Sequence, residues 1–246
     1  MGEIISSAFK DALPLLRSRQ RVYVVMAILC AIGGLLLPFL PSVPATTTSV
    51  SGVTTGTTMS GASFGFSIPE MFGALAAFWI FPAVVRTANP SFRMSVGVFF
   101  TLLGLGIVVA LASGIAGMAF LIPGIWVGVK LSQTIWAYAT TDGPVPFDRP
   151  LKDSWNVTTG QFWETFLFLI LVSIVVTIAL CIAFGIPAAI AAMVPWLGVV
   201  LLPVAFLGFV WGAHVQSLAQ LRWFLQLRAR HAATAGVPVI SGGALA

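Results

Sequence analysis

The chain has 246 residues, of which 59% are hydrophobic and only 8% are charged, and its formal net charge is +5 at pH 7. Soluble domains carry about 25% charged residues, so this composition excludes an ordinary soluble protein and predicts a polytopic membrane protein. In such a chain, the excess of Lys and Arg is first a topology signal and not evidence of nucleic-acid binding.

The first predicted element is an amphipathic helix over residues 2–20. One helical face carries the apolar side chains of Ile5, Phe9, Ala12, Leu13 and Leu16, while the charged residues lie elsewhere. This pattern is typical of a helix that lies in the membrane interface. A solvated helix packed on the rest of the protein would show the same pattern.

The first two predicted spans follow. Residues 22–40 form a run of nineteen residues without a charge, long enough to cross about 30 Å of hydrocarbon. A cleaved signal peptide is the rival interpretation, because the small residues near Ala45 suit a cleavage site, but the long leading region disfavours it. The uncharged Ser-, Thr- and Gly-rich stretch 41–67 predicts an extracytoplasmic loop, and residues 68–85 predict the second span.

Four further apolar segments bring the predicted number of spans to six. They cover residues 94–122, 125–139, 162–184 and 197–221. Pro123-Gly124 is predicted to end the third span, an uncharged turn at 185–196 precedes the sixth, and Pro203 predicts a kink. The polar stretch 141–160 contains a short amphipathic helix over 148–159, which Asp148 can cap, Pro150 can open and Gly160 can end.

The basic residues orient this all-α bundle. Eleven of the twelve Lys and Arg residues fall on one side of the spans, so the positive-inside rule places both termini in the cytoplasm. The chain divides into an amphipathic segment (1–21), a six-helix membrane domain (22–222) and a cytoplasmic tail (223–246). Anionic lipid headgroups are the expected ligands of the basic rim, which comprises Lys10, Arg17, Arg19, Arg21, Arg222, Arg228 and Arg230.

Lys130 is the one basic residue that breaks this rule, because it lies inside the predicted fourth span. Its ammonium group must snorkel to the interface, face water or find a partner. Glu70, at the outer end of the second span, is the predicted partner. Snorkelling is the alternative, and an ion or substrate site is the third.

His214, in the predicted sixth span, is another ionisable residue within the membrane. Its imidazole could bind haem or a chlorophyll magnesium, or form interhelical hydrogen bonds together with Gln216 and Gln220. Trp155 and Trp163 are expected at the cytoplasmic interface, where aromatic side chains form belts. The sequence contains no Cys/His metal cluster, phosphate-binding loop or nucleophile elbow, so no enzyme activity and no cofactor are expected.

Three short motifs resemble a bacterial family. They are the opening segment 2–10, the break Ile122-Pro123-Gly124-Ile125-Trp126 followed by Lys130, and the segment 150–163, PLKDSWNVTTGQFW. Together they resemble the YciC-like family, which is related to the membrane domain of some glycerophosphoryl diester phosphodiesterases. The loop 45–67 and the acidic Asp153 depart from the family pattern. The resemblance implies a six-helix bundle of the bacterial inner membrane without an established activity.

These features predict a non-enzymatic integral membrane protein. We expect an accessory subunit or envelope-organising scaffold that docks lipids or partner membrane proteins in a larger complex, with no nucleic-acid partner. Three spans of each orientation, with Pro- and Gly-broken segments at 122–125 and 184–187, leave a small transporter or channel as the alternative.

Overall fold

The computed structural model describes residues 1–36, 79–143, 145–193 and 195–234, and within these ranges the chain forms helices and connecting loops without a strand. The predicted all-helical fold is confirmed. Besides helical residues 79–85, the elements are α1 (Gly2–Ser18), α2 (Gln20–Leu36), α4 (Val96–Ala119), α5 (Leu121–Leu131), α6 (Thr134–Ala139), α7 (Arg149–Thr158), α8 (Phe162–Met193) and α9 (Pro195–Thr234).

Three of the described helices are long and apolar enough to cross a membrane. These candidate spans are Val96–Met118 in α4, Phe162–Ala183 in α8 and Pro203–Thr234 in α9. The chain is therefore a membrane protein by the length and composition of its helices. Residues 68–78 of the predicted second span, the outer loop and Glu70 lie outside the described residues, as do the ends of the first span and of the tail, whereas residues 79–85 of the second span are helical.

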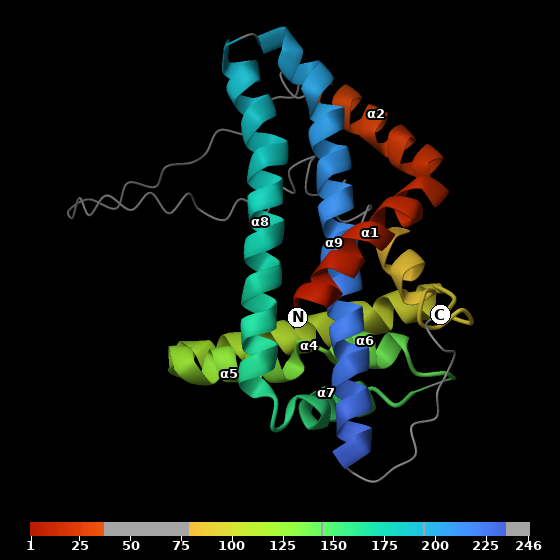
Figure 1. The fold of residues 1–246 in the computed structure, drawn as a ribbon, viewed down its shortest axis with the longest axis vertical. Coiled ribbons are helices and arrows are strands. Elements are labelled where there is room, and N and C mark those ends of the chain that lie inside the picture. The colour runs from red at the N-terminus through yellow and green to blue at the C-terminus, as the bar shows by residue number, and fades with distance from the viewer. Residues whose placement is uncertain (37–78, 144, 194, 235–246) are drawn as a thin grey trace, which may run out of the picture.

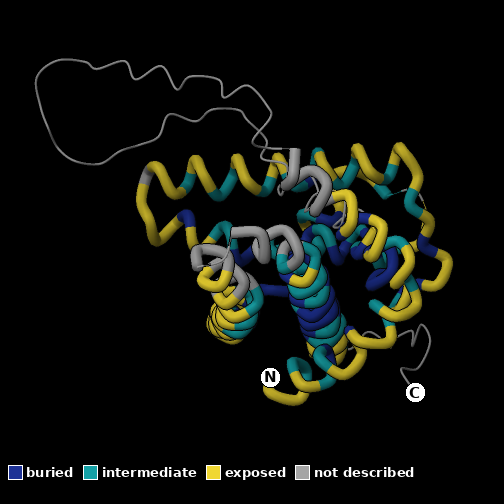
Figure 2. Tube along the Cα trace, turned by 90° about the horizontal axis from the view of Figure 1, so that it is seen from above, coloured by how far each residue is buried: buried dark blue, intermediate teal, exposed yellow. Residues whose placement is uncertain are grey.

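Helix α9 organises the fold. Helices α8 and α9 run side by side, and α1 and α2 pack against α9 (Figure 1). Figure 2 shows the buried residues concentrated along the central helices. Tyr23, Phe168, Val210 and Leu218 are almost completely buried there. Because backbone groups in hydrocarbon need internal partners, a long apolar segment favours continuous helix.

Helix also covers most of the predicted turn between the last two spans and the first part of the predicted tail. The predicted turn at 185–196 is helical up to Met193, and α9 begins at Pro195. Pro203 lies within α9, and the helix continues through the first part of the predicted tail to Thr234. Trp223 and Phe224 are buried in the core and do not belong to an exposed tail or an interfacial belt.

Helix α1 packs on α9 through its smallest side chains. Ala8 and Ala12 are completely buried, and the Phe9 ring meets the Trp211 ring edge-to-face at 5.1 Å. Leu13, which the sequence places on the apolar face, is 49% exposed. The contact face of α1 is thus turned away from Leu13.

Helices α4 and α5 form an antiparallel hairpin that lies across α8 and α9 in Figure 1. The chain turns at Phe120, whose backbone is extended, and α5 already starts at Leu121. The break therefore precedes Pro123 instead of coinciding with it, because proline is tolerated in the first turn of a helix. A Cβ atom added to Gly124 would lie 2.5 Å from Gly117 Cα, which shows how closely the two backbones approach.

The predicted fourth span, 125–139, is not one helix. Ser132 and Gln133 form a turn between α5 and α6. The Ser132 hydroxyl donates to the Val129 carbonyl at 2.8 Å, and the Thr134 hydroxyl donates to the Leu131 carbonyl at the same distance. Such side-chain hydrogen bonds compete with the helical ladder.

Candidate functional site

The contact between α5 and α7 brings two of the short sequence motifs together in space. Helix α7 agrees with its predicted bounds, since Pro150 lies in its first turn and Gly160 follows its end with φ +82°. That left-handed conformation is one that glycine adopts without steric cost. The buried face of α7 contains Ser154 and Thr158, whereas Trp155 is half-buried.

Hydroxyl groups of α7 cap the end of α5. The last carbonyls of a helix lack intrahelical partners, and the Lys130 carbonyl accepts a hydrogen bond from Ser154 Oγ at 2.7 Å. Thr158 Oγ1 lies 3.3 Å from the same carbonyl. The two hydroxyls, four residues apart on one helical face, thus fix the register of α7 against α5.

Lys130 is only 5% exposed, and its ammonium group lies beside a pair of indole rings that contact each other. Its Nζ donates to Thr159 Oγ1 at 2.8 Å and lies 5.6 Å and 5.5 Å from the ring centroids of Trp126 and Trp155. The two rings meet edge-to-face at 4.8 Å. We call Trp126, Lys130, Trp155 and Thr159 the Trp–Lys cluster.

Ring faces attract the ammonium group but do not neutralise it. Lys130 forms no ion pair with any carboxylate in the described part of the chain. The predicted partner, Glu70, lies outside that part, so the Lys130–Glu70 pair stays a prediction. A buried cation without a counter-charge is costly, which makes this cluster the strongest candidate site.

The exposed side of α7 carries an ion pair of its own. Asp148 was predicted to cap the helix, but its side chain makes no capping bond. Instead its carboxylate accepts a hydrogen bond from Lys152 Nζ at 2.6 Å. This hydrogen bond and the charge of Lys152 lower the pKa of Asp148, while the same hydrogen bond and the charge of Asp148 raise the pKa of Lys152.

His214 is completely buried, and both of its ring nitrogens have partners. Nε2 lies 3.2 Å from the hydroxyl of Tyr23 in α2, and Nδ1 lies 2.8 Å from the Val210 carbonyl. These contacts agree with the interhelical hydrogen bonding that was the alternative role for His214, whereas cofactor ligation stays an untested prediction. Of the two expected polar neighbours, Gln220 accepts a hydrogen bond from the Trp136 indole at 3.3 Å.

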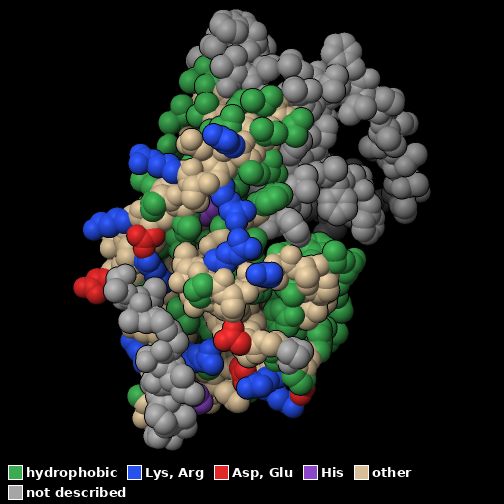
Figure 3. All heavy atoms as spheres, turned by 90° about the vertical axis from the view of Figure 1, so that its right-hand side faces the viewer, with side chains coloured by type: hydrophobic (Ala, Val, Ile, Leu, Met, Phe, Trp, Pro, Cys, Tyr) green, Lys and Arg blue, Asp and Glu red, His purple; other side chains and the backbone are tan. Residues whose placement is uncertain are grey.

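The predicted lipid-binding residues divide into paired and unpaired cations. Arg222 pairs with Asp11, Arg230 pairs with Glu164, and the Arg19 guanidinium lies 5.9 Å from the Trp79 ring. The other four predicted cations form no ion pair with a carboxylate of the described ranges: Lys10, Arg17, Arg21 and Arg228. Figure 3 shows Lys and Arg side chains gathered on one face, beside hydrophobic side chains.

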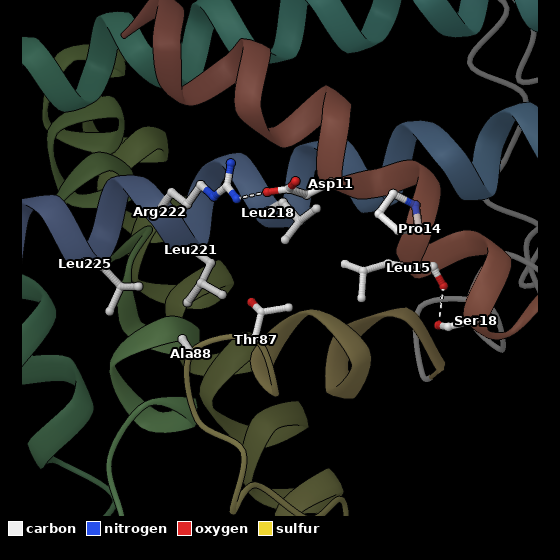
Figure 4. A pocket seen from close by; sticks show the side chains of 10 residues that line it. All are labelled: Asp11, Pro14, Leu15, Ser18, Thr87, Ala88, Leu218, Leu221, Arg222 and Leu225. Atoms are coloured by element: carbon white, nitrogen blue, oxygen red, sulfur yellow. Dashed lines mark hydrogen bonds and ion pairs between the residues drawn. The ribbon is translucent and has the colours of Figure 1, made fainter. Parts of the chain in front are cut away.

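A cavity of about 320 Å³ lies where α1, α9 and residues 87–88 meet (Figure 4). Leu15, Leu218 and Leu221 line it, and the ion pair between Asp11 and Arg222 joins the two helices at its edge. Arg222 therefore helps to hold α1 against α9 through its ion pair with Asp11. It is less available to a lipid phosphate than the unpaired cations are.

Trp163 is 69% exposed and contacts the rings of Phe162 and Phe166, so most of its surface is accessible. Sequence reasoning did not single out Ser154, Thr158 or Thr159. For Ser154 and Thr158 the signal was present, because two hydroxyl residues four positions apart lie on one face of a helix and can hydrogen-bond to the same neighbour.

Among the described residues, no group of three or more His, Cys, Asp or Glu side chains is placed to hold a metal ion. Comparison with known proteins gave no match to a family model, to a curated protein or to a solved structure.

Proposed function

We propose that the chain is a non-enzymatic integral membrane protein, an accessory subunit or envelope-organising scaffold that docks anionic lipids and partner membrane proteins through its basic face. The supporting observation is the set of exposed, unpaired cations on α1, α2 and α9: Lys10, Arg17, Arg21 and Arg228. Each basic residue near an anionic membrane surface contributes about 1 kcal/mol to attraction.

Membership of the YciC-like family, location in a bacterial inner membrane and two cytoplasmic termini belong to the same proposal. The long apolar helices and the one-sided distribution of Lys and Arg support it. Six spans stay a prediction. That number requires α4 to run along α8 and α9, whereas it lies across them in Figure 1.

The lipid part of the proposal is tested by reconstituting the full chain in vesicles of equal phosphatidylglycerol and phosphatidylcholine. Mass spectrometry then measures the anionic fraction of the lipids that remain around the protein after extraction. We expect the double variant Arg17→Gln, Arg228→Gln to lower this fraction more than the matched double variant Arg222→Gln, Arg230→Gln. The reason is that carboxylates already neutralise the second pair. Equal fractions in the wild type and the first variant would refute the proposal.

The scaffold part is tested by native purification in mild detergent, with identification of every co-purifying protein. A complex of constant stoichiometry supports the accessory-subunit role. A lone protein that moves solute across vesicle membranes supports the transporter alternative instead.

A further inference from the structure

We propose that the Trp–Lys cluster and the groove beside it bind one anionic phospholipid. Lys130 binds the headgroup phosphate, and an acyl chain lies in the groove between α5 and α8. This inference rests on the proposed lipid-docking function and adds a specific site to it, apart from the basic rim.

The ammonium group of Lys130 supplies the attraction. It has three N–H donors, and one of them is used by Thr159 Oγ1 at 2.8 Å. The indole faces of Trp126 and Trp155 attract the charge but do not take the other two N–H groups as an anionic oxygen does. A phosphate oxygen would satisfy a remaining donor and neutralise the buried charge.

The cluster is open to a ligand at its edge. The Trp126 side chain is 41% exposed, and Thr159 is an exposed residue at the end of α7. Indole side chains favour the boundary between hydrocarbon and headgroups, because they combine an apolar body with a polar N–H group. Two indole side chains beside a lysine therefore suit the depth at which lipid phosphates lie.

The groove supplies the place for the acyl chain. It has a volume of about 400 Å³, and its lining is apolar except for Ser173. Ile125 and Val129 line it from α5, each one position before Trp126 and Lys130. The groove and the cluster therefore occupy neighbouring faces of the same helix.

The polar and apolar parts follow each other along α8. Thr159 precedes α8, while the groove extends along that helix from Phe166 to Ile174. Eight residues of helix correspond to about 12 Å, close to the roughly 15 Å that one leaflet contributes to the hydrocarbon core. A phospholipid with its phosphate near Thr159 would thus extend its chain along α8.

The site is tested by native mass spectrometry of the full chain, titrated in detergent with phosphatidylglycerol or phosphatidylcholine. The informative variants are Lys130→Met, which removes the charge, and Ile170→Trp, which fills the groove. Lys130→Arg keeps the charge, and Lys152→Met removes an exposed lysine from α7 as the matched control. Glycerol phosphate, titrated in the same way, tests binding of the headgroup without chains.

We expect the wild type to bind one phosphatidylglycerol more tightly than phosphatidylcholine. Lys130→Met should weaken this binding roughly tenfold or more, the loss of one charge-assisted contact, while Lys130→Arg and Lys152→Met keep it. Ile170→Trp should weaken the binding of both lipids, because it fills the groove. If Lys130→Met does not fold, the Ile170→Trp variant alone tests whether the site binds a phospholipid. Unchanged affinity in Lys130→Met and Ile170→Trp overturns the proposal, as does glycerol phosphate binding as tightly as the lipid.

Failure of this site is distinct from failure of the basic face. The variant Arg17→Gln, Arg228→Gln should keep the one tightly bound lipid and lose only the general enrichment in anionic lipid. If instead the general enrichment in anionic lipid depends on Arg17 and Arg228 but no single tightly bound lipid is found, the proposed function of the basic face stands and the proposed Lys130 site is refuted.

Discussion

The close contact between α4 and α5 gives a sharp test of the fold. A Cβ atom at position 124 would lie 2.5 Å from Gly117 Cα, 2.7 Å from Gly117 N and 3.2 Å from the Ser113 carbonyl oxygen. These atoms belong to the backbone of α4, so no side-chain rotation relieves the clash. Gly124→Ala must push the two helices apart. Gly128→Ala places a methyl group on the same helix only 3.7 Å from Ser113 Cβ, an ordinary contact.

The two variants share the gain in helix propensity, about 1 kcal/mol for Gly to Ala, so their difference isolates the clash. Overpacking of this kind costs about 1–3 kcal/mol. For a chain of this size, 1 kcal/mol shifts the melting temperature by about 2–4 °C. We therefore expect Gly124→Ala to melt roughly 2–12 °C below Gly128→Ala.

The assay is thermal unfolding of the purified variants in one detergent, followed by tryptophan fluorescence. Gly117→Ala is a second control, because its added Cβ would lie 3.9 Å from Gly124 Cα. The added methyl group should therefore lower the melting temperature in Gly124→Ala on α5 but not in Gly117→Ala on α4. Equal melting temperatures for all three variants would refute the close approach of the hairpin.

Two further predictions concern topology and pH. In a background without Cys30 and Cys181, Ile122→Cys at the hairpin tip and Lys152→Cys on α7 should react with a membrane-impermeant thiol reagent from the same side of the membrane. This result is expected because the hairpin lies across α8 and α9. Reaction of the two variants from opposite sides would support six spans. Because the pKa of Asp148 is lowered, its ion pair stabilises α7 above about pH 3.9 and is lost as pH falls through the lowered value. Hydrogen exchange of α7 amides should therefore speed up at acid pH relative to Asp148→Asn, and identical profiles would contradict this.

Elements with local signals were predictable. Pro150 and Gly160 bracket α7, and both act through their own backbone geometry, so the predicted and observed bounds agree closely. The apolar run that forms α8 likewise needs no partner to be recognised. Its extension to Met193 was missed, because proline and glycine near residue 185 were given more weight than the need of a buried backbone for hydrogen bonds.

Elements that depend on tertiary contacts were not predictable in the same way. Nothing near His214 in the sequence indicates Tyr23, which lies 191 residues away and approaches only because α2 packs on α9. The turn at Ser132 interrupts a segment whose hydropathy suits a span. Hydropathy counts the polar groups of such a segment, but it does not show that they bond to carbonyls of their own helix.

Lys130 was predictable in part from local sequence and depends in part on tertiary contacts. Its sequence environment indicates that the ammonium needs a partner, whereas the choice of Glu70 assumed parallel spans. In the structure, Lys130 lies at the base of the hairpin, ten residues or about 15 Å from Phe120 at its tip. Ser154 caps α5 at this base. The Trp–Lys cluster therefore depends on contacts at the base of the hairpin and not on the position of its tip. The groove along α8 depends instead on the direction of α5. If thiol labelling places the tip on the far side of the membrane, Lys130→Met should still weaken headgroup binding, while Ile170→Trp should lose its effect.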